Sequence, residues 1–262
     1  MKQKSYSFAD YTREELRSIA PTALVVLPVG ATEQHGPHLP VGTDFYTVQY
    51  LARETARAID AEFPVLVAPV LPFGSSDYHL PFGGTLSLQT KVYYEVMLDL
   101  LRSLALDGFR KVFVLNGHGG NHELIQLAAR DIGFQHPLHI GAASYWTLAW
   151  DALIAAGARN SGGLPGHAGQ FETSLMLSLC GQMVSGERPS RSSIEGSDSQ
   201  AAQPAYRYEA PGFWQSIDGY TDSPANGSSD LGSRYLTLIV EAIARSLTSF
   251  YRVAATGKTE IV

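Results

Sequence analysis

One short stretch of the sequence, "LPVGATEQHGPHLPVGTDF" at residues 27–45, carries four polar side chains that could do chemistry: Glu33, His35, His38 and Asp44. Three glycines and three prolines shape it as a loop. Glu33 and His35 are two positions apart, so in extended backbone their side chains point the same way. The stretch could hold a metal ion, transfer a proton, or be an ordinary loop in which the histidines only form hydrogen bonds.

Three further polar segments follow apolar runs of the chain: "FGSSDYHLPFGGT" (73–85), "NGHGGNHE" (116–123) and "PGHAGQFETS" (165–174). Ligands of parallel α/β sheets collect beyond the carboxyl ends of the strands, so these segments are expected to converge on one rim. His118 lies between glycines, where the backbone can come close to a ligand. Convergence of the segments predicts an active site.

Five side chains form the candidate metal-binding set: Glu33, His35, Asp44, His118 and Glu172. Two histidines and three carboxylates, without cysteine, suit Zn²⁺, Mn²⁺ or Fe²⁺ rather than a structural zinc site, which is usually rich in thiolates. Three carboxylates offset three of the four charges of two divalent ions and leave one positive charge to hold a hydroxide. Such a metal pair, ~3.5–4 Å apart, can generate a bridging hydroxide and polarise a carbonyl. One carboxylate must bridge the ions, and Asp44 is the best candidate.

The other histidines have simpler interpretations. His38 follows a proline in a loop and His122 begins a predicted helix, so both are interpreted as structural. His136 and His139 flank a predicted strand and are interpreted in the same way. His79, in "DYHLPFGGT", is intermediate, because that segment resembles a loop on the substrate side.

Three other chemistries are disfavoured by missing residues. The glycines of "NGHGGNHE" could cradle a phosphate, but the segment lacks the last glycine of G-x-G-x-x-G and the lysine of a P-loop. The sequence contains no G-x-S-x-G, the nucleophile elbow of many serine hydrolases. The single cysteine, Cys180, excludes an internal disulfide and is interpreted as a small buried apolar residue.

The elements that must position these residues alternate between apolar runs and amphipathic segments. Strands are predicted at 22–30, 65–72, 111–117 and 137–145, and helices at 44–59, 90–108, 121–133, 173–181 and 231–251. Because the strands are too apolar to alternate, this rhythm predicts an α/β fold with a mostly parallel sheet covered on both faces. Residues 185–229 lack clear periodicity and contain "YRYEAPGFWQSIDGY", which predicts a lid or an interface segment.

Length and composition favour one α/β domain over residues 1–262. The hydrophobic content of 45% allows a sizeable core, and a net charge of −6 with scattered basic residues predicts neither a nucleic-acid nor a membrane partner. The N-terminus has no apolar signal segment, and no run reaches the ~18 apolar residues that a membrane helix needs. A cytoplasmic protein is therefore expected.

The long motifs, together with "GGTLSL" at 83–88, resemble those of the creatininase (creatinine amidohydrolase) family, in the same order from residue 22 to about 180. The resemblance implies a three-layer α/β sandwich, usually a homohexamer, with two divalent metal ions per subunit and hydrolysis of C–N bonds in small amides. By motif, Glu33, Asp44 and His118 would hold one metal, and His35 and Asp44 the other. His167 would occupy the place of the family's proton-transferring histidine.

One departure from the family pattern concerns the substrate. The creatinine-hydrolysing enzyme has Asn-Gly-His-Tyr-Glu-Asn where this chain has Gly119 and Gly120 after His118. Glu172 is then expected to complete the second metal site and serve catalysis there. The glycines should leave space beside the metals. Trp146, Trp150 and residues 206–220 could supply aromatic walls or could equally be packing residues. We therefore expect an amidohydrolase acting on another cyclic amide or a formamide. The alternative is a non-catalytic metal- or ligand-binding protein on the same fold.

Overall fold

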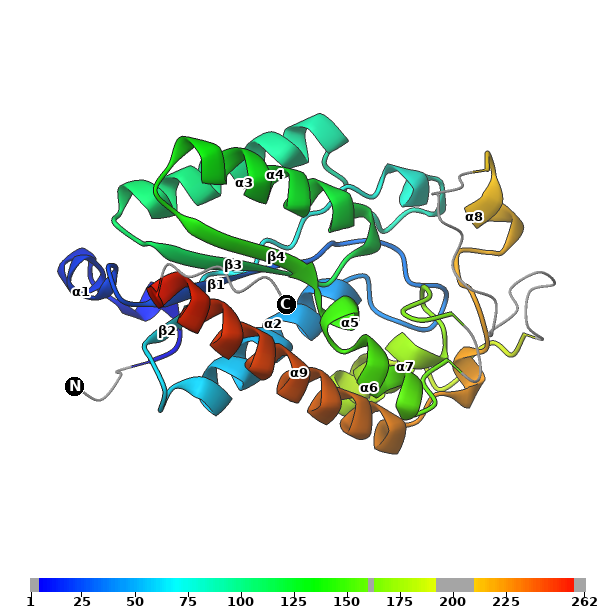
Figure 1. Cartoon of the computed structure of the whole chain (residues 1–262). Coiled ribbons are helices and arrows are strands. Elements are labelled where there is room, and N and C mark those ends of the chain that lie inside the picture. The colour runs from blue at the N-terminus through cyan, green and yellow to red at the C-terminus, as the bar shows by residue number, and fades with distance from the viewer. Residues whose placement is uncertain (1–4, 160–162, 192–209, 257–262) are drawn as a thin grey trace.

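The computed structural model describes residues 5–159, 163–191 and 210–256. Its sheet has four parallel strands in the spatial order β2-β1-β3-β4. Helices cover both faces of this sheet (Figure 1), so the predicted α/β sandwich with a parallel central sheet is confirmed. The strands are β1 (Leu24–Val29), β2 (Val65–Val67), β3 (Lys111–Asn116) and β4 (His139–Ser144).

The described helices include all five that the periodicity predicts, namely α2, α3, α4, α7 and α9. Four short helices, α1, α5, α6 and α8, were not predicted, because a helix of one or two turns has too few residues to show an amphipathic period. The helices are α1 (Arg13–Ile19), α2 (Thr43–Ile59), α3 (Thr90–Leu106), α4 (His122–Gln135), α5 (Tyr145–Leu148), α6 (Trp150–Ala155), α7 (Gln170–Cys180), α8 (Phe213–Ser216) and α9 (Ser229–Thr256).

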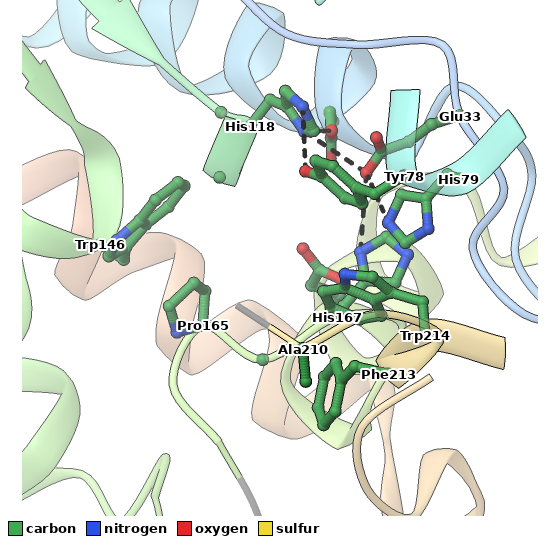
Figure 2. A pocket seen from close by; sticks show the side chains of 15 residues that line it. Glu33, Tyr78, His79, His118, Trp146, Pro165, His167, Ala210, Phe213 and Trp214 are labelled. Carbon is green, nitrogen blue, oxygen red and sulfur yellow. Dashed lines mark hydrogen bonds and ion pairs between the residues drawn. The ribbon is translucent and has the colours of Figure 1, made fainter. Parts of the chain in front are cut away.

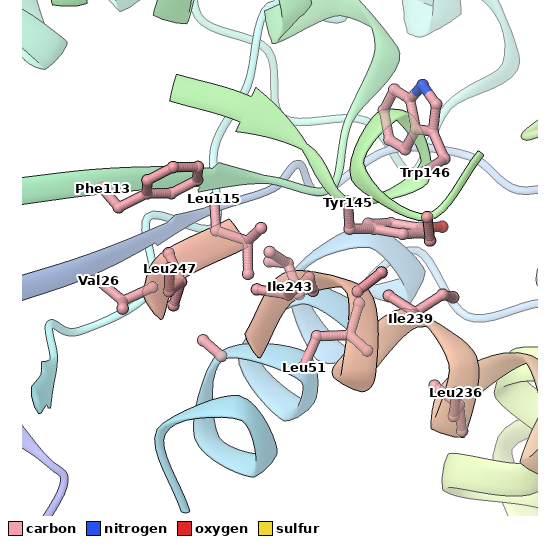
Figure 3. Close-up of a cluster of buried hydrophobic side chains, with 14 of the residues drawn as sticks. Val26, Leu51, Phe113, Leu115, Tyr145, Trp146, Leu236, Ile239, Ile243 and Leu247 are labelled. Carbon is pink, nitrogen blue, oxygen red and sulfur yellow. The ribbon is translucent and has the colours of Figure 1, made fainter. Parts of the chain in front are cut away.

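Strand β1 shows why a central strand of this sheet carries no polar positions. Leu24 and Val26 point into the core formed with α2 and α9, part of which is drawn in Figure 3. Val25 and Leu27 point into the opposite core, formed with α3 and α4. Both faces of the strand are therefore buried, and every position is apolar.

Strand β2 is shorter than predicted, because it ends at Val67 rather than at residue 72. Pro69 has no N–H to donate to a neighbouring strand, so regular pairing stops before it. Pairing resumes only locally, where the Leu71 N–H donates to the Pro28 carbonyl at 3.0 Å. The rest of the predicted strand becomes the loop that leads towards the site.

The segment predicted as a lid or an interface is only partly described, since residues 192–209 lie outside the described ranges. Its described part contains α8 and a short 3-10 helix, η5 (Pro224–Asn226). Helix α8 packs against another 3-10 helix, η2 (Asp77–Phe82), which follows β2 (Figure 1). Two segments far apart in the sequence thus meet beside the candidate site.

Among the described helices, none combines the length and the apolar character needed to span a bilayer.

Candidate metal centre

The loop after β1, the first turn of α2 and the end of β3 bring four predicted ligands together. Glu33 and His35 come from the loop, Asp44 from α2, and His118 from the residue before the 3-10 helix η3 (Gly119–Asn121). Each of the four side chains is at most 3% exposed. Groups of this polarity are rarely buried without compensating partners, so the contacts around them are decisive.

Asp44 lies between the two imidazoles. Its Oδ1 is 3.1 Å from His35 Nε2, and its Oδ2 is 3.0 Å from His118 Nδ1. Glu33 Oε1 is 3.3 Å from the same His118 nitrogen, and Glu172 Oε2 is 3.7 Å from His35 Nε2. Three carboxylates therefore surround two imidazoles, with the Asp44 carboxylate shared by both.

In each imidazole, one ring nitrogen faces the carboxylates and the other, the outer nitrogen, faces a backbone carbonyl oxygen. His118 Nε2 lies 3.1 Å from the Ser75 carbonyl oxygen, and His35 Nδ1 lies 3.1 Å from the Glu33 carbonyl oxygen. A carbonyl only accepts hydrogen bonds, so these outer nitrogens carry the protons of the neutral rings. The bare nitrogens, His118 Nδ1 and His35 Nε2, then aim their lone pairs at carboxylate oxygens.

Lone pairs facing carboxylates repel each other unless a positive charge lies between them. Glu33 Oε2, His35 Nε2 and Asp44 Oδ2 are buried and complete no hydrogen bond with any described residue. Divalent cations would supply that charge, and Glu33, His35 and Asp44 offer donor atoms within 4.8 Å of one another. In residue type and burial, these residues fit a divalent metal site.

The protonation of the metal-free site shows how much positive charge it attracts. Burial disfavours a charged His35, but Asp44 and the neighbouring carboxylates outweigh it and raise its pKa to about 10. Burial raises the pKa of Glu172 to about 8. Burial also opposes ionisation of Glu33, yet His118 holds the pKa of that carboxyl well below its usual range. In the absence of metal, protons supply the charge that a cation would supply.

A cavity of about 330 Å³ opens beside these residues (Figure 2). One end is polar and includes Glu33, Asp44, His118 and Glu172. The rest of the lining includes four aromatic side chains: Tyr78, beside His118, and Trp146, Phe213 and Trp214. The arrangement can place an apolar or planar group against the aromatics while a polar bond faces the candidate ligands.

His167 also lines the cavity, as the sequence predicts for a proton-transferring group. Its Nδ1 lies 3.6 Å from Glu33 Oε1. Burial lowers the pKa of His167 well below its ordinary value, so the ring is neutral at pH 7 and can accept a proton. The histidines interpreted as structural are held elsewhere: His38 Nε2 lies 2.9 Å from Thr173 Oγ1, and His122 Nδ1 lies 2.8 Å from Ser144 Oγ.

For Trp150 the structure decides between the two alternatives, and for Gly120 the expectation of space is wrong. Trp150 lies outside the cavity lining and packs against the hydrophobic core, because α6 turns that side of the helix towards α9. Gly120 leaves no open space: a Cβ there would collide with the Ser75 carbonyl oxygen and approach the Tyr78 hydroxyl to 2.9 Å. Gly119, by contrast, lines the cavity as expected, and apart from its two chain neighbours no described residue has an atom within 4 Å of the place that a Cβ would take. Only one of the two glycines opens space.

Three residues of the site were missed or left undecided by sequence reasoning. His79 is fully buried, and its Nε2 lies 3.7 Å from Glu33 Oε1 without a hydrogen-bond partner among the described residues. Gln34, between two candidate ligands, contacts both His79 and His167. Trp214 lies in the irregular aromatic segment, whose composition is a signal for a cavity wall but does not single out one ring.

Comparison with known proteins agrees with this arrangement. A sequence model of the family described as creatinine amidohydrolase matches residues 9–247. The chain belongs to the creatininase family. This family member is 35% identical over 190 residues to a mycofactocin precursor peptide peptidase from Mycobacterium tuberculosis, covering 68% of this chain and 66% of the relative. The match thus spans about two thirds of the peptidase's length.

A second relative of this creatininase-family chain is a creatinine amidohydrolase from Pseudomonas putida, 32% identical over 188 residues, with 66% of this chain and 71% of the relative covered. Among solved structures, a mutant creatininase of Zn-Zn type superposes with a TM-score of 0.78 at 27% identity. A manganese form gives 0.76 at 26% identity. Both cover 95% of this chain and 99% of the other. The named relatives are hydrolases, and both the family and the fold match the prediction.

Proposed function

We propose that this chain is a metal-dependent amidohydrolase that cleaves a C–N bond of a cyclic amide or a formamide. The observation that carries the proposal is the pair of imidazole nitrogens, His35 Nε2 and His118 Nδ1, that face the shared Asp44 carboxylate from two sides. This arrangement calls for positive charge at two adjacent places. The metal-containing relatives support zinc or manganese as the ions, with iron as a further choice of similar ligand preference.

The proposal assigns two overlapping ligand sets. Glu33, Asp44 and His118 would hold one ion, and His35, Asp44 and Glu172 would hold the other. When bound, the ions would polarise the substrate carbonyl and lower the pKa of water. Glu172 Oε2 also accepts the Ala168 N–H at 2.6 Å, which fixes its carboxylate at the start of α7.

His167 is the proton-transfer group of the proposed reaction. In the cavity wall its Nδ1 lies beside Glu33, and its ring contacts that of Trp214. A neutral imidazole there can take a proton from the attacking water and pass it to the leaving nitrogen. Gly119 and the aromatic wall would accommodate the rest of the substrate.

Metal analysis and a substrate screen test the proposal together. The purified protein should contain about two divalent ions per chain, and a chelator should abolish hydrolysis that added Zn²⁺ or Mn²⁺ restores. The screen should contain cyclic amides, formamides and, because one relative is a peptidase, short peptides. Fewer than one ion per chain, or hydrolysis that survives complete metal removal, would contradict the proposal.

The non-catalytic alternative makes a different prediction for the same experiment. A metal- or ligand-binding protein on this fold would retain its ions and hydrolyse none of the compounds. The buried neutral His167 argues for catalysis, because metal binding by the two ligand sets above does not require that residue. Turnover of any amide in the screen, lost with His167→Ala, would exclude the alternative.

We also propose that the chain assembles into a homo-oligomer, a hexamer by analogy with the family resemblance. Near η2 the surface exposes three apolar side chains, since Val41 is 41%, Leu80 50% and Leu86 60% exposed. Burying such residues in a subunit interface would be favourable. Light scattering should show an assembly, and a stable monomer at micromolar concentration would contradict it.

A further inference from the structure

The side-chain amide of Gln34 lies between two histidines of the cavity. Its Oε1 accepts the Gly36 N–H at 2.8 Å, and its Nε2 donates to the Gly219 carbonyl at 2.9 Å. A backbone N–H only donates and a backbone carbonyl only accepts, so these two contacts fix which end of the amide is nitrogen. The amide is 7% exposed, and its orientation is set by the backbone rather than by solvent.

The orientation of Gln34 determines where His79 carries its proton. Gln34 Nε2 lies 3.0 Å from His79 Nδ1. Because the amide nitrogen can only donate, His79 Nδ1 must accept, and the proton of the ring is then on Nε2. That Nε2 is buried, has no hydrogen-bond partner in the described part of the chain, and lies 3.7 Å from Glu33 Oε1. His79 thus aims an N–H at Glu33.

The backbone of Gln34 determines the proton of His167. His167 Nε2 lies 2.9 Å from the Gln34 carbonyl oxygen, which can only accept, so Nε2 carries the proton. Nδ1 is then a bare lone pair, 3.6 Å from the same Glu33 Oε1. Gln34 Nε2 is also 3.0 Å from His167 Nε2, but its two hydrogens are already used by Gly219 and His79.

The two rings stand side by side below Glu33 (Figure 2), with centroids 4.3 Å apart and planes 20° from parallel. We propose that Gln34 is a positioning residue that holds both rings as Nε2–H tautomers, so that His79 presents an N–H donor and His167 a lone pair to one point beside Glu33. The donor orients the Glu33 carboxylate, and the lone pair remains available for proton transfer.

The same arrangement separates His79 from the metal ligands. Glu33, His79 and His167 offer donor atoms within 4.8 Å of one another, close enough to hold an ion. A protonated His79 Nε2 cannot ligate a metal, so this tautomer keeps the three residues from closing around an ion. Trp214 covers it, with its ring centroid 4.7 Å from that of His79 and 5.3 Å from that of His167. The catalytic consequence rests on the proposed function, whereas the tautomers do not.

Magic-angle-spinning ¹⁵N NMR of histidine-labelled protein, as purified, tests the proposal directly, because protonated and bare ring nitrogens resonate in separate ranges. We expect a protonated Nε2 and a bare Nδ1 for both His79 and His167, with His79→Asn and His167→Asn used to assign the signals. A proton on Nδ1 of His79 in the native protein would overturn the proposal. This outcome does not depend on metal content or on hydrolysis, which test the proposed function separately.

The variant Gln34→Glu provides a second test of the proposal. Its carboxylate can still accept from Gly36 but cannot donate to His79, so His79 should gain a proton on Nδ1 while His167 keeps its tautomer. Orientation of Glu33 would weaken, and we expect kcat to fall about 10–100-fold, as for lost supporting contacts at metal sites, with little change in KM.

Gln126→Glu is the matched control, because Gln126 Nε2 lies 3.1 Å from His122 Nε2 on the outer surface of α4. It should change only the His122 signals and leave activity intact. An unchanged His79 tautomer in folded Gln34→Glu would refute the assignment. If that variant does not fold, the measurement on the native protein still decides.

Discussion

Asp44 Oδ1 lies 3.1 Å from His35 Nε2, although the two residues belong to different elements, the first turn of α2 and the loop after β1. The same carboxylate turns its other oxygen towards His118. One short side chain thus joins the two proposed ligand sets.

Asp44→Asn should remove both metals. The amide has the same size, but it carries no charge and is a poor ligand for a second ion. Metal content should fall from about two ions to fewer than one per chain, with a loss of activity greater than about 100-fold. Plasma emission spectrometry of the dialysed protein measures the content. Asp99→Asn, on the exposed surface of α3, is the control and should retain both ions; equal retention by Asp44→Asn would exclude a bridging role.

Metal uptake should release protons at neutral pH. The pKa of His35 is raised to about 10 and that of Glu172 to about 8, so both groups favour the protonated form at pH 7 in the metal-free protein. Ligation removes these protons, and metal affinity should therefore increase as the pH rises towards 8 and above. Calorimetric titration with Zn²⁺ in two buffers of different ionisation enthalpy counts the protons. The Glu172→Gln variant should release fewer protons on binding Zn²⁺. A count of zero released protons for the native protein would show that the site is already deprotonated.

His167→Ala should abolish most turnover while retaining the metals. A positioned general acid–base group contributes about 10²–10⁴-fold to rate, and kcat should fall by that factor. His139→Ala, on the exposed first residue of β4, provides a histidine control with unchanged kcat. If His167→Ala also loses a metal ion, His167 is a ligand rather than a proton carrier.

The two glycines after His118 should respond differently to the same substitution. A Cβ at Gly120 meets the Ser75 carbonyl oxygen, so Gly120→Ala should destabilise the fold by about 1–3 kcal/mol, as overpacking does. Beyond its two chain neighbours, no described residue lies within 4 Å of a Cβ at Gly119, so Gly119→Ala should leave stability unchanged and alter KM only. Chemical denaturation curves of the two variants compare them. Similar denaturation curves for the two variants would mean that the loop containing Ser75 moves to make room for the added Cβ at little cost in stability.

Creatinine should be a poor substrate of this chain. The creatinine-hydrolysing pattern needs a tyrosine where this chain has Gly119, which adds no side chain to the cavity wall. A pocket without the matching groups can discriminate by orders of magnitude. We expect kcat/KM for creatinine below ~10⁴ M⁻¹s⁻¹ in the metal-loaded protein, with a higher value for another amide of the screen. A creatinine value above that figure would show that the glycines do not decide specificity.

Local pattern was sufficient for much of this molecule. The strands were recognisable because both faces of the sheet are covered, which makes every position of β1 apolar and every position of β3 buried. The long helices were recognisable from their amphipathic period. Glu33, His35 and Asp44 lie within twelve residues, on a Gly/Pro-shaped loop and the helix turn that follows it, so the chain itself keeps them near one another.

Tertiary packing decided what local pattern could not. Gln34 and His167 are 133 positions apart, and no spacing rule relates the carbonyl of one to the ring of the other. The space at Gly120 is taken by the backbone of Ser75, from a different loop, so composition alone suggested an opening that does not exist. Sequence periodicity shows which face of an element is apolar. The protonation of a buried side chain and the space beside it depend instead on groups that packing brings from distant segments.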